Sequence, residues 1–155
     1  MKILVPHDGS RISNKAFDRA LEFAQKLNYE IILLHVIDFK LLESVALRKY
    51  IQEKYELEKA QKQLLNYLKT GAESMLKENV EKARKMGVKI RFKLGIGSAH
   101  RGILDVAADE NVDLIIMGSK GMSSEEKDAE KKIKILGSIA RQVSELASCP
   151  VMIIK

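Results

Sequence analysis

The apolar residues of this chain alternate between short unbroken runs and longer stretches with helical spacing. Short apolar runs between turn residues are typical of buried strands, and apolar positions three and four residues apart predict amphipathic helices. The predicted strands are Ile3–Val5, Ile31–Ile37, Val88–Leu94, Asp113–Met117 and Val151–Ile154, and the predicted helices lie around 16–27, 57–83, 103–108 and 139–147. This alternation indicates a doubly wound α/β fold, with a parallel sheet and helices on both faces.

The first strand, helix and second strand have recognisable boundaries. Pro6, which lacks a main-chain donor, ends the first run and leads into the turn 7–10. Ser10 or Ser13 can cap the helix, and Asn28 is a suitable residue for its C-terminal end. Short links between a strand, a helix and a second strand predict a right-handed parallel unit.

The middle of the chain predicts one long helix. Apolar residues keep helical spacing from Leu57 to Ala83 and straight through Gly71, which costs about 1 kcal/mol relative to alanine inside a helix. The preceding segment, from Leu41 to Glu56, has a looser pattern and predicts either a separate helix or a partly ordered arm. We interpret the long helix as an amphipathic crossover; the alternative is a helix that binds a partner.

The third strand carries basic residues at alternate positions. Lys89, Arg91 and Lys93 alternate with apolar residues, which predicts a half-exposed strand at the sheet edge. The turn that follows, Gly95-Ile-Gly97-Ser-Ala-His100, comes near the dinucleotide fingerprint but has His100 in place of the third glycine. It also lacks the acidic residue that the fingerprint requires after a following strand, so we reject a dinucleotide site. Ser98 is instead expected to cap the next helix.

Glycines follow the fourth predicted strand and precede the last helix. The strand opens into Gly118 and Gly121, and Gly137-Ser138 stands immediately before the last helical pattern. Glycine lets main-chain N–H groups approach a ligand that a Cβ atom would hold away, and a helix N-terminus attracts phosphate. The two elements predict a phosphate cradle. The alternative interpretation is two ordinary glycine turns in an α/β protein.

The ordered set of these segments resembles the universal stress protein family over nearly the whole chain. Gly118-x-x-Gly121, a loop and Gly137-Ser138 are similar to the family's nucleotide motif, Gly-x-x-Gly, nine residues, Gly-Ser/Thr. The other matching segments are Lys2–Ser10, Leu33–Ile37, Gly97 with Ile103–Ala107, Asp113–Ser119 and Cys149–Ile154. The resemblance implies an adenine nucleotide alpha hydrolase-like fold with strand order 3-2-1-4-5, in a single domain spanning residues 1–155.

The resemblance also implies a stress-response protein that binds ATP, with Mg²⁺ carried by the nucleotide. The strand order reverses between strands 1 and 4, and ligands of such sheets lie at the carboxyl ends there. Asp8 is expected to accept hydrogen bonds from ribose hydroxyls or to help hold the magnesium ion through water, with capping of its own turn as the structural alternative. Val36 matches the family position whose backbone contacts adenine. The expected nucleotide-binding residues are Pro6, His7, Asp8, Val36, Met117, Gly118, Ser119, Lys120, Gly121, Gly137, Ser138 and Ile139.

Two features depart from the family pattern. The loop between Gly121 and Gly137 has fifteen residues, 122–136, where the family's nucleotide binders have nine, so it must bulge out or form structure of its own. Ala99 stands where the family usually has a proline. The loop mixes Lys and Glu and has little apolar surface to bury. We expect it to be mobile without ligand and to become ordered when phosphate occupies the amides of Gly121 and Gly137.

Composition and charge narrow the function. At 155 residues and 46% hydrophobic, the chain can bury the core of one domain. The net charge of +6 is spread over alternating Lys and Glu, and Trp is absent, so nucleic-acid binding is not favoured. The single cysteine, Cys149, argues for a reducing compartment. With no apolar run near the roughly eighteen residues of a membrane span and no recognisable signal peptide, we expect a cytoplasmic protein.

No catalytic motif is recognisable in the chain. His7, His35 and His100 lack the spacing of a metal site, and His35, within an apolar strand, is interpreted as a core residue. His7 could instead reach a phosphate. The Walker loop, the nucleophile elbow and the Cys-x-x-Cys pair are all absent from the sequence. We therefore favour a nucleotide-binding module with at most weak ATPase activity. The alternatives are a member of the same fold that binds no nucleotide and acts through protein contacts, and a slow ATP hydrolase.

The last strand predicts a homodimer. Val151–Ile154 follows Pro150, is apolar on both faces, and lies at the sheet edge in the implied order, with no charge before Lys155. A two-fold axis would let the same strand of a second copy pair antiparallel with it, as members of the resembled family commonly do. The competing interpretation is that part of Leu41–Glu56 covers this edge within one chain.

Overall fold

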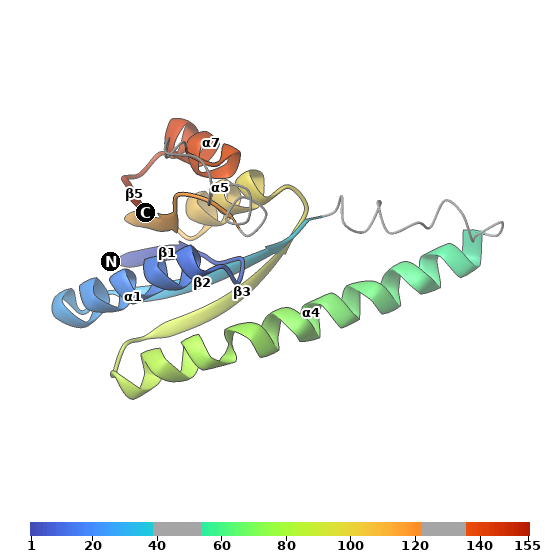
Figure 1. The fold of residues 1–155 in the computed structure, drawn as a ribbon, viewed down its shortest axis with the longest axis horizontal. Helices are drawn as coiled ribbons and strands as arrows, with labels where there is room; N and C mark the ends of the chain where they lie inside the picture. The colour runs from blue at the N-terminus through green and yellow to red at the C-terminus, as the bar shows by residue number, and fades with distance from the viewer. Residues whose placement is uncertain (39–53, 122–135) are drawn as a thin grey trace, which may run out of the picture.

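Five parallel strands form one sheet with helices on both faces (Figure 1). The computed structural model describes residues 1–38, 54–121 and 136–155. The strands are β1 (Lys2–Pro6), β2 (Glu30–Ile37), β3 (Ile90–Ile96), β4 (Leu114–Gly118) and β5 (Val151–Ile154), and the helices are α1 (Arg11–Leu27), α4 (Lys54–Lys85), α5 (Ala99–Asp109) and α7 (Ser138–Leu146). The sheet order is β3-β2-β1-β4-β5, with every neighbouring pair parallel. This confirms the predicted doubly wound fold and strand order.

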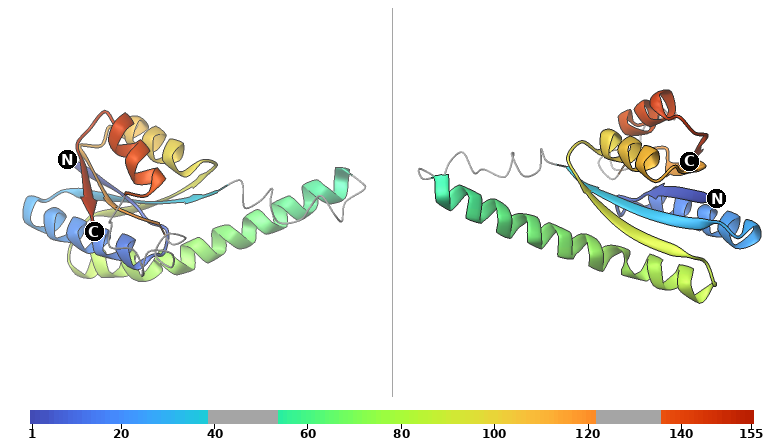
Figure 2. Two further views of the ribbon diagram at one scale, coloured as in Figure 1. Left: turned by 45° about the horizontal axis from the view of Figure 1, so that its top comes forward. Right: turned by 180° about the vertical axis from the view of Figure 1, so that it is seen from behind.

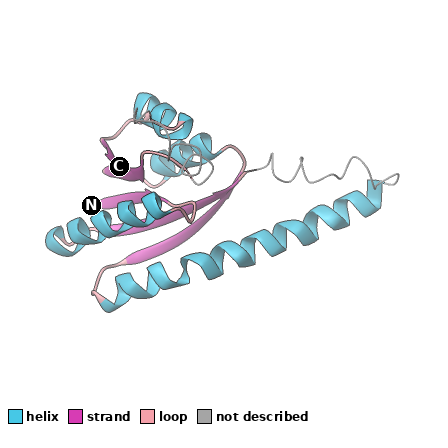
Figure 3. Ribbon diagram, in the orientation of Figure 1, coloured by secondary structure: helices cyan, strands magenta, loops and turns pink. Residues whose placement is uncertain are grey.

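Helices cover both faces of the sheet (Figures 2 and 3), and successive residues of β1, β2, β4 and β5 alternate between two hydrophobic cores. Ile3 and Val5 pack with Phe17 of α1 and with residues of α4. Leu4, between them, packs with Ile103 of α5 and with residues of α7. Because successive side chains of a strand point to opposite faces, a strand covered on both sides is apolar throughout. This is why β1, β2, β4 and β5 appear in the sequence as apolar runs.

Helix α1 begins and ends at the predicted residues. Ser10 is the N-cap, and its Oγ accepts a hydrogen bond from the N–H of Ser13 at 3.1 Å. The hydroxyl of Ser13 donates back to the carbonyl of Ser10 at 2.9 Å, so Ser13 lies inside the first turn. Asn28 ends the helix in the left-handed conformation, with φ of 56°. Left-handed backbone at this position lets a helix stop within one residue.

Ser98 occupies the N-cap position of α5, as predicted, but makes a different bond. Its backbone is extended, yet its side chain makes no capping hydrogen bond. Its Oγ lies 2.9 Å from Nδ1 of His100 instead. The prediction was therefore right about where the helix begins and wrong about how the serine side chain is used.

Helix α4 is the predicted long helix, and its N-terminal half extends well beyond the sheet (Figure 1). In its C-terminal half, Ala72, Leu76 and Ala83 are buried against the body of the protein. Of the upstream segment predicted over Leu41–Glu56, residues 54–56 belong to α4 and the rest lies outside the described residues. Neither α4 nor any other described helix contains an apolar stretch that could cross a membrane.

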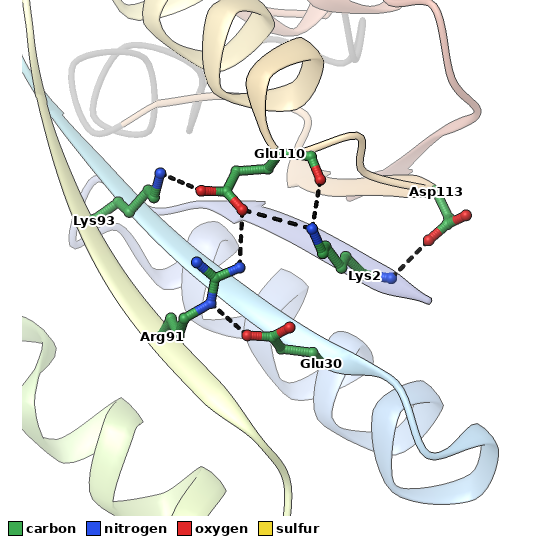
Figure 4. Close-up of polar contacts among 6 residues, drawn as sticks. All are labelled: Lys2, Glu30, Arg91, Lys93, Glu110 and Asp113. Atoms are coloured by element: carbon green, nitrogen blue, oxygen red, sulfur yellow. Dashed lines mark hydrogen bonds and ion pairs between the residues drawn. The ribbon is translucent and has the colours of Figure 1, made fainter.

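The basic residues of the edge strand β3 are held in an ion-pair cluster at the amino ends of the strands (Figure 4). Glu110, at the C-cap of α5, contacts Nη2 of Arg91 at 2.9 Å, Nζ of Lys93, and Nζ of Lys2 at 3.7 Å. Arg91 also pairs with Glu30 on β2. The edge position predicted for this strand is confirmed. The cluster joins the end of α5 to three strands.

Candidate functional site

A cavity, partly open to solvent, lies at the carboxyl ends of β1, β2 and β4. The sheet order reverses at β1, where the connections turn to opposite sides and leave a crevice. The lining residues are Pro6, His7, Asp8, Ser13, Leu34, Val36, Ala99, Ile103, Met117, Gly118, Lys120, Gly121, Gly137, Ser138, Ile139 and Ala140.

The cavity brings together all the predicted nucleotide-binding residues except Ser119. Ser119 is buried, its N–H donates to the carbonyl of Ile154 at 2.7 Å, and its own carbonyl accepts from the N–H of Gly137 at 2.8 Å. Ser119 therefore connects β4 to β5 and to the start of α7, next to the lining residues Gly118 and Gly137.

Sequence reasoning missed five residues of the lining: Ser13, Leu34, Ala99, Ile103 and Ala140. Leu34, Ile103 and Ala140 are also buried core residues, which is how their sequence pattern presented them. Strand periodicity could have found Leu34, because it lies two residues before Val36 and therefore on the same face of β2. Ala99 and Ala140 lie in the first turns of α5 and α7, and the sequence does not show that both helices begin at the cavity.

The turn after β1 holds His7 inside the molecule. His7 is 4% exposed, and its Nδ1 accepts the N–H of Gly9 at 3.1 Å. An accepting Nδ1 leaves the ring proton on Nε2, which lies 3.1 Å from Oδ1 of Asn14. Burial lowers the pKa of His7, partly opposed by the hydrogen bond to Asn14, and this favours the same neutral form. This geometry favours a structural role for His7 over the phosphate contact that the sequence left open.

His35 supports the same turn from the neighbouring strand. Its Nδ1 lies 2.8 Å from the carbonyl oxygen of His7, and the residue is half-buried. His35 was predicted to be a core residue, and the structure places it within β2 but only half-buried. Among the described residues, no three His, Cys, Asp or Glu side chains gather as a metal site.

Asp8 both closes its own turn and faces the glycine loop. Its Oδ1 accepts the N–H of Ser10 at 3.0 Å, which is the structural role predicted as an alternative. Its Oδ2 lies 3.0 Å from the position that a Cβ atom of Gly121 would occupy. The absence of a side chain at Gly121 therefore lets the glycine loop approach this carboxylate at the cavity wall.

The start of α7 presents main-chain donors to the cavity, but Gly137 is not one of them. The N–H of Gly137 already donates to Ser119, so the expectation that its amide receives phosphate is not supported. Arg141 makes the first bond within the helix, to the carbonyl of Gly137. The N–H groups of Ser138, Ile139 and Ala140 thus have no partner within the helix, and the positive end of the helix dipole lies there.

Val36 directs its main-chain N–H and C=O toward the cavity. Two residues earlier, the carbonyl of Leu34 accepts from His7 on the β1 side; one residue later, the carbonyl of Ile37 accepts from Gly97 on the β3 side. Because successive residues of a strand direct their main-chain groups to alternate sides, those of Val36 point to the β1 side. Strand β1 has already ended at Pro6. Val36 therefore presents a donor and an acceptor beside each other at the cavity.

Comparison with known proteins agrees over the whole length of the chain. The model of the universal stress protein family matches residues 1–155. Universal stress protein YxiE of Bacillus subtilis is 32% identical over 154 residues, which cover 99% of this chain and 98% of the relative. Universal stress protein MJ0577 of Methanocaldococcus jannaschii is 33% identical over 164 residues, covering 99% and 94%. A solved structure of MJ0577 has a TM-score of 0.81 at 31% identity, over 99% of this chain and 94% of that one.

Two more distant solved structures share the fold and contain an adenine nucleotide. A universal stress protein family protein from Arabidopsis thaliana with AMP bound has a TM-score of 0.66 at 22% identity, over 100% of this chain and 91% of that one. A universal stress protein from Archaeoglobus fulgidus in complex with dAMP has a TM-score of 0.63 at 20% identity, over 100% and 98%. From the family match and the relatives at 32% and 33% identity, we conclude that this chain belongs to the universal stress protein family.

Proposed function

We propose that this protein binds an adenine nucleotide, ATP with its Mg²⁺, in the cavity at β1, and that it acts in the stress response as a binding module. The observation that carries the proposal is the pair of main-chain features on opposite sides of β1. Val36 of β2 offers a donor and an acceptor, and the start of α7, beyond β4, offers helix amides. The AMP and dAMP complexes of fold relatives support the same class of ligand.

The Val36 side of the cavity suits adenine better than guanine. The adenine edge carries an acceptor at N1 next to a donor at N6, which complements one main-chain N–H and one C=O. Guanine presents a donor at N1 and an acceptor at O6. Its N1–H would therefore face the N–H of Val36, and its O6 would face the carbonyl oxygen of Val36. Leu34, Ile103 and Ala99 supply the apolar surface that a planar base needs.

The opposite side suits phosphate. Lys120 and the first helical residues of α7, Ser138 and Ile139, line the cavity there, and a helix N-terminus favours negative charge. Asp8, between the two sides, can accept hydrogen bonds from ribose or bind a magnesium ion through water. With no cluster of three metal-binding side chains among the described residues, Mg²⁺ would be held mainly by the phosphates.

The same geometry favours binding over hydrolysis. A general base needs a free lone pair within reach of the attacking water. Both ring nitrogens of His7 are engaged within its own turn, and Oδ1 of Asp8 already accepts a main-chain N–H. His7 therefore has no free lone pair with which to activate a water molecule, and Asp8 is engaged in closing its own turn, so we propose a module that retains its nucleotide.

Calorimetric titration with ATP, adenosine and GTP tests the proposal, together with mass spectrometry of any nucleotide that copurifies. ATP and adenosine should bind, and GTP should bind at least about tenfold more weakly, because its base edge is reversed. A protein that binds neither ATP nor adenosine would contradict the proposal and favour the nucleotide-free alternative. Release of phosphate at a steady rate would favour the slow hydrolase.

Ser138→Pro probes the phosphate side without disturbing the helix. Ser138 is the first residue of α7, where proline is favoured, and Gly137 before it has φ −62° and ψ 155°, which proline permits. The substitution removes one amide donor and should weaken ATP binding about tenfold while leaving adenosine binding unchanged. Ser138→Ala keeps the amide and is the matched control. Equal ATP affinity in both variants would exclude the helix amide as a phosphate contact.

A further inference from the structure

Two glycines border the side chain of Val36, and neither uses the conformational freedom of glycine. Gly95 is the register partner of Val36 in β3, and Gly102 lies in the first half of α5. The positive-φ glycines among the described residues are Gly9, Gly87 and Gly97. Glycine is disfavoured inside strands and helices alike. What both positions gain is therefore the space that a side chain would fill.

That space is occupied by the methyl groups of Val36. A Cβ atom at Gly102 would lie 3.1 Å from Cγ2 of Val36 and 3.3 Å from Cγ1, and one at Gly95 would lie 3.3 Å from Cγ2. These separations are shorter than ordinary contacts between carbon atoms, so Val36 would have to move. Since β2 lies between β3 and β1, movement away from Gly95 is movement toward the β1 side, where the cavity is.

We propose that Gly95 and Gly102 are positioning residues for the base side of the cavity. Because they have no side chains, Val36 can pack against them and stay out of the cavity. This leaves room for a planar base and aligns the main chain of Val36 with the edge of that base. This inference rests on the proposed adenine-nucleotide function. If the two glycines act in ligand binding, replacing them should lower the affinity for ligand. If their role were only structural, replacing them would change only the stability of the protein.

Gly102→Ala separates the two roles, because alanine favours a helix more than glycine does. The variant should unfold at the same or a higher temperature than the unmodified protein, yet bind adenosine and ATP about tenfold more weakly, since one methyl group in an apolar pocket has an effect of that order. Gly95→Ala should weaken the binding of adenosine and of ATP in the same way. Gly71→Ala in α4, whose Cβ atom would meet no atom within 4 Å, is the matched control and should bind like the unmodified protein.

Val36→Ala identifies the intermediary. It removes the two methyl groups that the new Cβ atom would meet, so the double variant Val36→Ala/Gly102→Ala should bind adenosine as well as Val36→Ala alone. The inference is overturned if Gly102→Ala and Gly95→Ala bind adenosine normally, if only ATP binding falls, or if Val36→Ala fails to cancel the effect of Gly102→Ala. In these cases the proposed function stands. If the unmodified protein binds neither ligand, the proposed function fails and this inference fails with it.

Discussion

At the end of β4, helix α1 occupies the space that a side chain of Gly118 would need. A Cβ atom there would lie 2.8 Å from Cγ2 of Ile12 and 3.4 Å from the main-chain carbon of the same residue. Gly137 is similarly confined, because a Cβ atom at this position would lie 3.3 Å from the carbonyl oxygen of Ser119. From the sequence, these glycines were predicted to let main-chain N–H groups approach a ligand. Packing and ligand approach both require glycine, so the residue type alone could not reveal the packing reason.

Gly118→Ala is therefore expected to destabilise the fold itself. Overpacking against Ile12 should lower the free energy of unfolding by about 1–3 kcal/mol. Ile12→Ala removes Cγ2, which relieves the overpacking. The substitution should therefore lower the free energy of unfolding less in the Gly118→Ala variant than in the unmodified chain. Urea unfolding of the four proteins measures this coupling. Strictly additive losses would show that the two residues do not compete for the same space.

His7 predicts a pH dependence of stability. Burial lowers the pKa of His7 below its ordinary value of 6.5, so the unfolded chain takes up the proton more readily than the folded chain does. The stability that neutral His7 contributes is present above pH 6.5 and is lost as the pH falls toward the lowered pKa. From about pH 8 to about pH 5, the unmodified protein should lose more unfolding free energy than His7→Gln does. Parallel pH profiles for the two proteins would contradict this assignment.

At the scale of elements, the boundaries were predictable wherever a local rule sets them. Ser10 caps α1, Asn28 ends it in the left-handed conformation, and Gly87, with φ of 72°, follows α4. The partners of the basic residues on β3 were not predictable. Arg91 and Lys93 meet Glu110 only because α5 ends above the same edge of the sheet, and periodicity carries no information about that.

Glu110 gives this cluster a measurable pH signature. Hydrogen bonds from Arg91 and Lys93 lower the pKa of Glu110 from 4.5 to about 2. Its contribution to stability is therefore present above pH 4.5 and is lost as the pH falls toward 2. Glu110→Gln should have a lower unfolding temperature than the unmodified protein at neutral pH, and the difference should shrink as the pH falls below 4.5. Glu73→Gln, on the exposed surface of α4, is the control. A difference that does not change with pH would exclude the ion pairs as its cause.

At the scale of the whole molecule, the position of the cavity at the carboxyl ends of β1 and β4 followed from topology once the strand order was known. The alternation of strands and helices predicted a doubly wound sheet, but the order 3-2-1-4-5 came from family resemblance, since periodicity does not specify which strands are neighbours. The hydrogen bond that engages the amide of Gly137 could not be read from the glycine motif. Residues 122–135 of the lengthened loop lie outside the described residues, so its ordering by nucleotide stays a prediction.

The position of β5 at the edge of the sheet determines how a second copy could pair with it. The carbonyls of Pro150 and Ile154 accept hydrogen bonds from Ile115 and Ser119, so these residues direct their main-chain groups toward β4. By alternation, Val151 and Ile153 direct theirs away from the sheet. Their side chains join one core and those of Met152 and Ile154 join the other, so the strand is apolar on both faces. Such an edge favours pairing with a second strand.

Ile153→Pro should therefore separate dimerisation from folding. The substitution removes an N–H that points outward, leaving the ladder between β4 and β5 intact, whereas Met152→Pro removes a donor that faces β4 and would break that ladder. In sedimentation, the unmodified protein should be a dimer and Ile153→Pro should shift toward monomer while keeping most of its thermal stability. Met152→Pro should lose stability as well. An unmodified protein that sediments as a monomer would contradict the dimer and favour coverage of the edge within one chain. A dimer unaffected by Ile153→Pro would place the interface elsewhere on the molecule.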